Sequence, residues 1–231
     1  MNFEGKKLLV IASHPDDEIL GCGGLIGRVK NEGGEVYVLV MTVGNTELYG
    51  GHSDIETRIK ETEDVMKFIK VDDYDIALPG DEYHLKLDAL PQKTMIDIIE
   101  KGSKVSLNKV KPDILAFPFN GSSNQDHRVV SQASFTACRS RPHQLKSFQS
   151  LILLYEDPVQ NNLMNGFIPN FYVNIKDFID FKCKALSLYK SQVRGPLHQC
   201  SPETITIKAQ SRGREVAIEA AEAFMLYRIL M

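Results

Sequence analysis

The chain has 231 residues, of which 43% are hydrophobic and 25% are charged, and its formal net charge at pH 7 is −3. These are ordinary values for a globular protein that is long enough to bury a core without disulfides or metals to hold it together. The slightly negative charge argues against a nucleic-acid-binding protein, although it does not exclude a small substrate that carries phosphate. We expect one domain over residues 1–231.

Four cysteines are present, and none belongs to a C-x-x-C pair. This spacing predicts reduced thiols rather than a zinc knuckle or a redox site, as is typical of a reducing compartment. The first apolar run begins at Leu8 and is too short for a signal peptide or a membrane span. We therefore expect a cytoplasmic protein without a membrane span. Its oligomeric state is open, a homo-oligomer included.

Strand and helix patterns alternate in the first part of the chain. Residues 8–12 form an unbroken apolar run, which is typical of a strand buried on both faces. A helical pattern follows over residues 16–31 and ends at Gly33-Gly34, and residues 36–41 form a second buried run. This β-α-β order predicts a parallel, doubly wound sheet.

The later elements follow the same alternation. Ser53-Asp54-Ile55-Glu56 matches a capping box, which predicts the start of a helix. Ser201-Pro202 begins a last helix, which we extend to about Arg228 because Ala217, Ala220, Ala221 and Phe224 continue the helical spacing. Long polar loops are expected at residues 44–52 and 160–170, where they would select the substrate. The remaining strands are predicted at residues 74–78, 113–117, 151–155 and 171–175, and the remaining helices at residues 91–106, 125–138 and 177–189.

The segment His14-Pro15-Asp16-Asp17-Glu18 directly follows the first predicted strand. In an open α/β sheet, the loops beyond the carboxyl ends of the strands form the ligand crevice. His14 and Asp17, on one tight turn, can offer an imidazole nitrogen and a carboxylate oxygen to a metal ion. Asp16 lies beside them, where a carboxylate can take a proton from a metal-activated water. The alternative is a capped helix start that contains a histidine by chance.

A second group, Asn124-Gln125-Asp126-His127, follows the strand predicted at residues 113–117. Asn124 suits a helix N-cap. His127 precedes Val130 by three residues and so shares the inward face of the predicted helix. From there it can meet His14 and Asp17 and complete a site of two histidines and one carboxylate. Zinc is the metal expected for hydrolysis, although iron(II) uses similar ligands.

The other histidines have no acidic residue at ligand spacing. We expect them on the surface or in loops, with His84 or His198 as candidates to line the pocket; the set is His52, His84, His143 and His198.

The two groups resemble the motifs of the PIG-L/LmbE-like deacetylase family. Residues 12–18 match its A-H-P-D-D-E pattern, with Ser13 added, and residues 124–128 (NQDHR) match its second metal motif. Further matches are the glycines Gly21, Gly23 and Gly24, the R-x-x-E pair Arg58 and Glu61, and weaker similarity at residues 136–142, 154–156, 191–192 and 212–224.

The resemblance implies an α/β fold, a Rossmann-like three-layer sandwich with a mostly parallel central sheet. It implies removal of an N-acetyl group from a small amino-sugar substrate of the N-acetylglucosamine type, with Zn²⁺ or another divalent cation as cofactor. On this chain it assigns His14, Asp17 and His127 as metal ligands and Asp16 as the general base. It also suggests that Arg58 contacts the sugar or its attached group.

The chain departs from the family pattern at Asn124, where many members carry a histidine that polarises the carbonyl or protonates the leaving group. Asparagine can donate a hydrogen bond to an oxyanion but cannot deliver a proton. Asp16 would then carry out both proton transfers, and Asn124 is either an oxyanion donor or only a helix cap. Asp126 is expected to orient a metal ligand from behind.

Two other classes of protein are alternatives to a deacetylase. A nucleotide-binding enzyme is disfavoured because residues 13–17 stand where G-x-G-x-x-G would be, and their acidic side chains would repel a pyrophosphate. A catalytically weak or inactive relative that binds only a sugar or a metal is the alternative that Asn124 keeps open.

Overall fold

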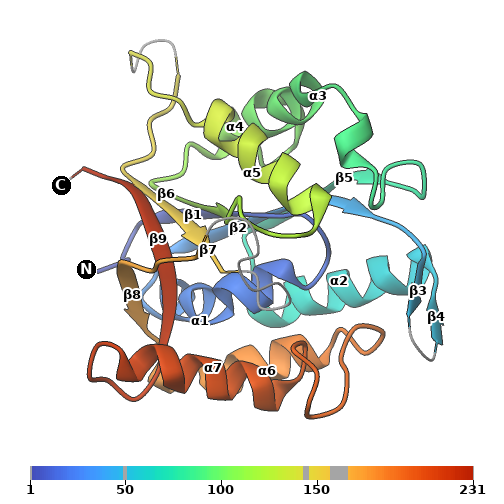
Figure 1. The fold of residues 1–231 in the computed structure, drawn as a ribbon. Helices are drawn as coiled ribbons and strands as arrows, with labels where there is room; N and C mark the ends of the chain where they lie inside the picture. Colours follow the sequence, from blue (N-terminus) through green and yellow to red (C-terminus); the bar gives the residue numbers. More distant parts are fainter. Residues whose placement is uncertain (1, 49–50, 143–145, 157–165, 231) are drawn as a thin grey trace.

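The computed structural model describes residues 2–48, 51–142, 146–156 and 166–230. A seven-stranded sheet in the order β5-β2-β1-β6-β7-β9-β8 forms its centre (Figure 1). Five neighbouring strands are parallel, and β9 runs antiparallel between β7 and β8. The strands are β1 (Lys7–Ala12), β2 (Glu35–Val43), β5 (Asp73–Pro79), β6 (Ile114–Pro118), β7 (Leu151–Tyr155), β8 (Phe171–Asn174) and β9 (Ala221–Ile229). The predicted fold class, with its mostly parallel sheet, is confirmed.

Helices cover both faces of this sheet and make three layers (Figure 1). On one face lie α1 (Asp17–Asn31) and α2 (Ile55–Ile69), with α6 (Ile179–Ser187) and α7 (Pro202–Arg214) outside them. The other face carries α3 (Gln92–Asp97), α4 (Leu107–Val110) and α5 (Gln125–Ala137). Short helical turns are η1 (Leu87–Ala89), η2 (Ile98–Gly102) and η3 (Lys176–Phe178).

The unbroken apolar sequence of β1 reflects two cores, one on each face of the sheet. Leu8, Val10 and Ala12 pack in the core beneath α1, whereas Leu9 and Ile11 pack in the core beneath α5. All five side chains are fully buried. Strands β1 and β9, far apart in the sequence, belong to one sheet, and a single domain over residues 1–231 stays a prediction.

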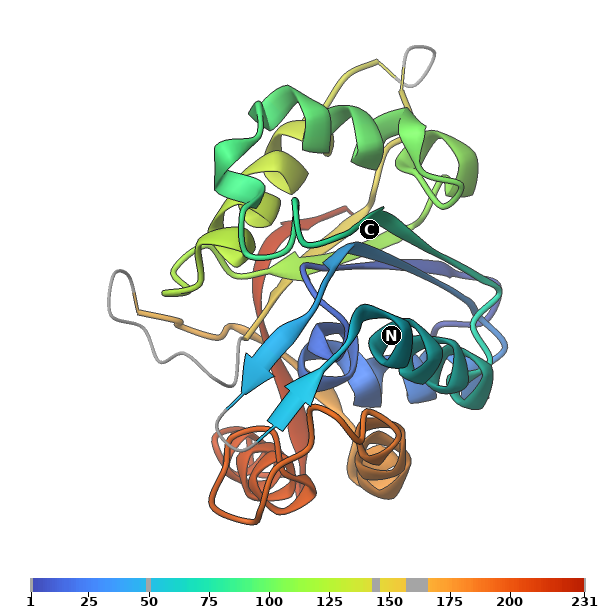
Figure 2. The same ribbon diagram turned by 90° about the vertical axis from the view of Figure 1, so that its right-hand side faces the viewer.

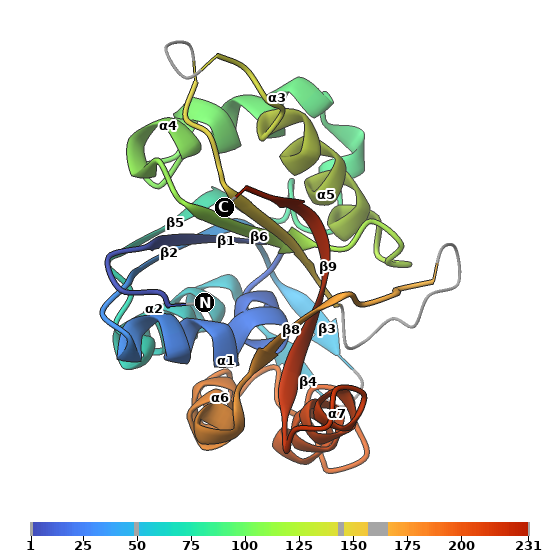
Figure 3. The same cartoon turned by 90° about the vertical axis from the view of Figure 1, so that its left-hand side faces the viewer.

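The C-terminal segment was predicted wrongly. The helix that begins at Pro202 ends at Arg214, and β9 follows from Ala221 (Figure 3). The alanines of residues 220–223 favour helix locally. In the fold, however, the backbone of β9 is paired with β7 on one side and β8 on the other. Tertiary pairing thus overrides local propensity.

Three smaller predictions also need correction. The N-cap of α2 is Asp54 rather than Ser53, since the Asp54 side chain accepts a hydrogen bond from the Thr57 amide. The helix expected at residues 91–106 is shorter, because α3 runs directly into η2 and η2 ends at Gly102. The loop expected at residues 44–52 contains a hairpin of β3 (Thr46–Leu48) and β4 (Gly51–Ser53), which extends from the end of β2 towards the level of α6 and α7 (Figure 2). Most of the loop expected at residues 160–170 lies outside the described residues.

The start of α1, which carries the first motif, is fixed by close packing and by a buried ion pair. A Cβ atom on Gly21 would clash with the ring of Tyr155, whose hydroxyl donates a hydrogen bond of 2.9 Å to the Ile11 carbonyl. Further along α1, the Glu222 carboxylate accepts hydrogen bonds from the amides of residues 24 and 25, and Lys182 Nζ joins Glu222 to the Leu20 carbonyl. These contacts hold α1 against β7 and β9, so its N-terminus has a fixed position at the carboxyl edge of the sheet.

None of the helices in the described ranges combines the length and the apolar character that a membrane span requires.

Candidate metal and active site

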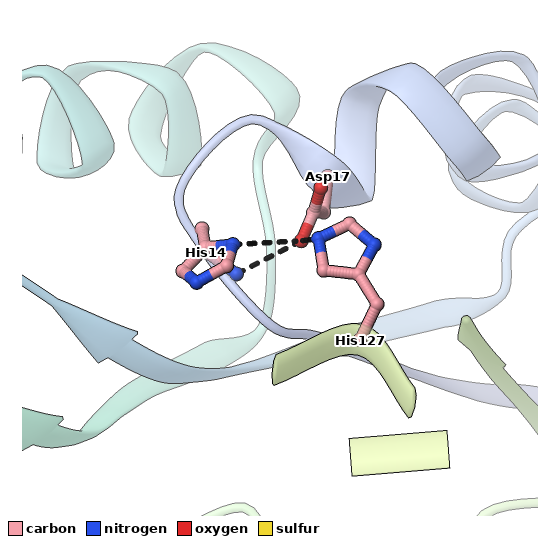
Figure 4. A group of neighbouring side chains, drawn as sticks. All are labelled: His14, Asp17 and His127. Atoms are coloured by element: carbon pink, nitrogen blue, oxygen red, sulfur yellow. Dashed lines mark hydrogen bonds and ion pairs between the residues drawn. The ribbon is translucent and has the colours of Figure 1, made fainter. Parts of the chain in front are cut away.

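His14, Asp17 and His127 meet at the carboxyl ends of β1 and β6 (Figure 4). One potential ligand atom from each residue lies within 4.8 Å of the other two. Asp17 Oδ2 lies between the two imidazoles, 3.8 Å from His14 Nδ1 and 3.2 Å from His127 Nε2. All three residues are buried. The fold thus brings together side chains that are more than a hundred positions apart in the sequence.

Asp126 holds the ring of His14 from the other side. Its Oδ2 accepts hydrogen bonds of 2.9 Å from His14 Nε2 and from the Leu85 amide, and its Oδ1 accepts one of 3.0 Å from the Leu87 amide. The carboxylate is fully buried. Because the bond to Asp126 places a proton on Nε2, the lone pair of His14 is on Nδ1, the atom that faces Asp17. A carboxylate behind a histidine is a common way to orient a metal ligand.

The two aspartates of the first motif have opposite pKa shifts. Burial alone would raise the pKa of Asp17, but the charges and hydrogen bonds of His127 and His14 hold it below its ordinary value. The pKa of Asp16 is raised well above its ordinary value, first by burial and then by the charges of Asp17 and Glu18. Asp17 is therefore suited to remain a carboxylate, and Asp16 is suited to accept a proton and hold it.

Asp16 also has an unusual backbone conformation. It caps α1 with φ 97° and ψ −27°, in the left-handed region that a residue with a side chain rarely adopts. Its side chain lines the same cavity as the His14, Asp17 and His127 side chains. Strained backbone of this kind costs on the order of 1–3 kcal/mol and is concentrated at functional sites.

This donor set suits a divalent cation. Two imidazole nitrogens and a carboxylate oxygen are a common set for catalytic zinc, and three protein ligands leave a position for water. The Asp126 contact adds the outer support that such sites require. The residues present therefore fit the metal that the sequence predicts.

Arg58 and His84 form the neighbouring wall of the site. Arg58 Nη1 donates hydrogen bonds to the Gly44 carbonyl (2.9 Å), Thr46 Oγ1 (2.7 Å) and His84 Nε2 (3.0 Å). Burial, followed by the charges of His14 and Arg58, lowers the pKa of His84 to about 3. His84 is therefore neutral, and its ring packs edge-on against His14 with centroids 5.0 Å apart.

The position of Arg58 bears on its predicted contact with the substrate. Arg58 lines the cavity, yet it is only 3% exposed, and burial lowers its pKa against the opposing effects of Asp16 and Asp17. Its hydrogen bonds are used to hold the hairpin and His84. Contact with the sugar stays a prediction, whereas support of the site is visible in the structure.

Asn124 is the N-cap of α5. Its Oδ1 accepts a hydrogen bond of 2.9 Å from the Asp126 amide, which occupies the carboxamide oxygen. Asn124 also lines the cavity. The helix-cap role predicted from the sequence is present, and it is compatible with the other predicted role of donating to an oxyanion.

These residues open into a cavity of about 280 Å³. Besides the two motifs, its walls contain Thr46 from the hairpin and residues 192, 194, 198 and 200 from the segment between α6 and α7. His84 and His198, the two histidines singled out as pocket candidates, both lie in these walls. His84 is buried and His198 is exposed.

Some supporting contacts had no clear signal in the sequence. Glu61 lies on α2 and accepts hydrogen bonds from the amide (2.8 Å) and hydroxyl (2.6 Å) of Ser191. The Tyr189 hydroxyl donates a hydrogen bond of 2.6 Å to buried Glu18. Glu61 belongs to the R-x-x-E pair and Glu18 to the first motif, and each is bound by a residue at or just after the end of α6. The resemblance to the family includes Glu61 in the R-x-x-E pair and Ser191 in the similarity at residues 191–192. Neither match indicates that the two residues contact each other.

Comparison with known proteins gives consistent matches. Residues 9–138 match the family model PIG-L, described as GlcNAc-PI de-N-acetylase. The chain is 28% identical over 192 residues to the uncharacterized deacetylase YaiS of Escherichia coli strain K12, a match that covers 80% of this chain and 91% of YaiS.

Solved structures share the fold at low sequence identity. The N,N'-diacetylchitobiose deacetylase from Pyrococcus horikoshii has a TM-score of 0.75 at 23% identity, covering 96% of this chain and 83% of that one. The 4-carboxy-2-hydroxymuconate hydratase GalB from Pseudomonas putida KT2440 has a TM-score of 0.77 at 17% identity, covering 98% of each chain. Since one of these two proteins is a hydratase, the fold alone does not decide the reaction. The family match extends over more than half of the sequence and includes both motifs, and the chain therefore belongs to the PIG-L family of deacetylases.

Proposed function

We propose that this protein is a zinc-dependent N-deacetylase that releases acetate from an N-acetylglucosamine-type amino sugar or its conjugate. The observation that carries the proposal is the meeting of His14, Asp17 and His127, with Asp16 beside them in one cavity. Zinc is the ion that best suits this donor set in a hydrolase, although another divalent cation would use the same residues.

The substrate class rests on what the relatives act on. The family description names a GlcNAc conjugate, and the Pyrococcus protein is named for a disaccharide of acetylated amino sugars. A cavity of about 280 Å³ has room for one sugar ring and its acetamido group. The group attached to the sugar would extend out of the cavity.

A divalent cation bound by His14, Asp17 and His127 would polarise the amide carbonyl and lower the pKa of the attacking water. Asp16 takes the proton from that water as it adds to the carbonyl carbon. The Asn124 amide group donates to the oxygen on which negative charge develops. Asp16 then returns the proton to the departing nitrogen as the carbon–nitrogen bond breaks, giving acetate and a free amine. The raised pKa of Asp16 supports both transfers, since burial makes its carboxylate a stronger base, and the protonated carboxyl can then act as the acid.

The alternative is a catalytically weak relative that binds a sugar or a metal. Asn124 favours it, because a carboxamide cannot protonate the leaving amine and its oxygen is already used to cap α5. The two proposals differ in turnover and not in metal binding.

The test is acetate release from a panel of N-acetylated sugars by the metal-free protein, by the same protein with zinc restored, and by Asp16→Asn loaded with zinc. We expect no release without metal and recovery with zinc. Asp16→Asn should retain zinc but lose roughly 100- to 10,000-fold in kcat. Acetate release that is unchanged when the metal is removed by a chelator would refute a metal-dependent reaction. Full turnover of Asp16→Asn would show that this residue is not the general base. A zinc-loaded protein that releases no acetate from any sugar would support the weak relative.

A further inference from the structure

The cavity has a second polar wall, formed by the segment between α6 and α7. Arg194 and His198 lie in this wall, on a part of the chain separate from both metal motifs. Residues 194–198 also border an open hollow of about 500 Å³ on the adjoining surface. A substituent of the sugar that leaves the cavity on this side would pass these two side chains. A role for this wall in substrate binding rests on the proposed deacetylase function.

Hydrogen bonds to α2 and within the segment itself fix the position of this wall. Ser191, at its start, is held by both carboxylate oxygens of Glu61. At its end, the Cys200 carbonyl accepts a hydrogen bond from the Arg194 amide at 3.4 Å. Arg194 Nη1 donates to the carbonyls of Ser191 (2.8 Å) and Val193 (3.0 Å). One nitrogen of the guanidinium therefore anchors the group to its own loop.

The other guanidinium nitrogens of Arg194, Nε and Nη2, form no hydrogen bond within the described residues, nor does any described carboxylate pair with Arg194. Arg58, the other arginine of the cavity, differs. It is 3% exposed and faces the charges of Asp16 and Asp17, which raise its pKa against the effect of burial. Among the described lining residues, Arg194 is thus the permanent cation that has no anionic partner.

His198 adds a second donor to the same wall. Its Nδ1 accepts a hydrogen bond of 3.0 Å from the Cys200 amide. An acceptor nitrogen carries no proton, so the neutral ring has its proton on Nε2. Arg194 and His198 therefore present N–H groups, and an arginine fork is suited to the two oxygens of a carboxylate or phosphate.

We infer that Arg194 and His198 form a subsite for an anionic substituent of the substrate, a carboxylate or a phosphate ester attached to the amino sugar. The acetamido group lies at the metal ligands while the anion contacts the wall between α6 and α7. The preferred substrate is then an acidic conjugate rather than a neutral free sugar.

The test compares matched glycosides of N-acetylglucosamine: the carboxymethyl glycoside and the 1-phosphate against the neutral methyl glycoside. For the zinc-loaded protein we expect kcat/KM to favour the anionic compounds by roughly 10- to 100-fold, mainly through KM. In Arg194→Gln this preference should disappear, and Arg194→Lys should recover only part of it because lysine lacks the fork. Arg214→Gln, which changes an exposed arginine at the end of α7, is the control and should keep the preference. The carboxylate and phosphate compounds show which anion is preferred.

Calorimetric binding of the same glycosides to the full chain separates this subsite from the proposed reaction. Selective binding of the anionic compounds that Arg194→Gln abolishes supports the subsite even if no acetate is released, in which case only the deacetylase proposal fails. Equal binding and equal kcat/KM for the neutral and anionic glycosides would overturn the subsite. An unchanged preference in Arg194→Gln would overturn the role of Arg194.

Discussion

His14 Nε2 donates a hydrogen bond of 2.9 Å to Asp126 Oδ2, which comes from a residue 112 positions further along the chain. This bond joins the turn after β1 to the first turn of α5. Asp126 also accepts hydrogen bonds from the amides of Leu85 and Leu87, so the carboxylate holds the loop after β5 next to His14. Three chain segments at the carboxyl edge of the sheet therefore depend on one buried carboxylate.

Replacing Asp126 by asparagine should weaken metal binding without removing a ligand. An asparagine keeps one acceptor oxygen but presents an NH₂ group to His14 or to the two leucine amides, so the imidazole is less well oriented. We expect a loss of roughly 10- to 100-fold in zinc affinity, measured by competition with a chelator. Asp88→Asn, an exposed substitution on η1, is the control. Unchanged affinity in Asp126→Asn would show that the bond to His14 is only structural.

Replacing His127 by asparagine should remove a proposed ligand. Its loss should exceed that of Asp126→Asn, and stoichiometric zinc should no longer be found by elemental analysis. Because a bound ligand stabilises the folded state, zinc should also stop raising Tm in this variant. His52→Asn changes an exposed histidine of β4 and should behave as the unmodified protein. Zinc retained by His127→Asn at one per chain would exclude His127 as a ligand.

The positions of the two metal motifs could be predicted because each follows a buried strand of a parallel sheet. The strands β1 and β6 are neighbours, and their carboxyl ends bring His14 and His127 to one place. Residue spacing within each motif, together with the alternation of strand and helix, was enough for this step. The β9 strand could not be predicted in the same way, because its alanine-rich start has helical propensity and only pairing with β7 and β8 decides its state.

The residues that support the site were harder to predict from the sequence. The sequence places His84 in a loop and does not indicate its burial, because its ring packs against His14 only when the loop after β5 folds over the turn after β1. The bond between Arg58 and His84 likewise joins α2 to that loop. Such contacts depend on loop conformation, which local propensity and periodicity do not determine.

Glu18 should make the stability of the metal-free protein depend on pH. Burial raises its pKa from 4.5 to about 7, so the folded state holds the proton more tightly than the unfolded state. This contribution is fully present below pH 4.5 and is lost as pH rises through 7, with a size on the order of 3 kcal/mol. Glu18→Gln, which stays neutral, should therefore have the higher Tm at pH 8 and a similar Tm at pH 4.5.

Thermal unfolding of chelator-treated protein at these two pH values checks the effect. The side-chain oxygen of a glutamine can accept a hydrogen bond from the Asp16 amide, and its NH₂ group can donate one to the Tyr189 hydroxyl oxygen. Both contacts of Glu18 can therefore be kept. Glu56→Gln on the exposed first turn of α2 is the control for a change of one charge. An equal Tm difference between Glu18→Gln and the unmodified protein at both pH values would contradict a raised pKa for Glu18.

Glu61→Ala should loosen the wall that carries Arg194. The carboxylate of Glu61 binds both the amide and the hydroxyl of Ser191, and hydrogen bonds to a charged group contribute about 1.5–3 kcal/mol each. Without them, residues 191–200 should exchange their amide hydrogens faster, and KM should rise more than kcat falls because the metal motifs are untouched. Hydrogen exchange followed by mass spectrometry and steady-state kinetics measure the two effects. Glu63→Ala, an exposed neighbour on α2 that forms an ion pair with Lys60, should change neither. If exchange in residues 191–200 is the same in both variants, Glu61 does not hold this wall in place.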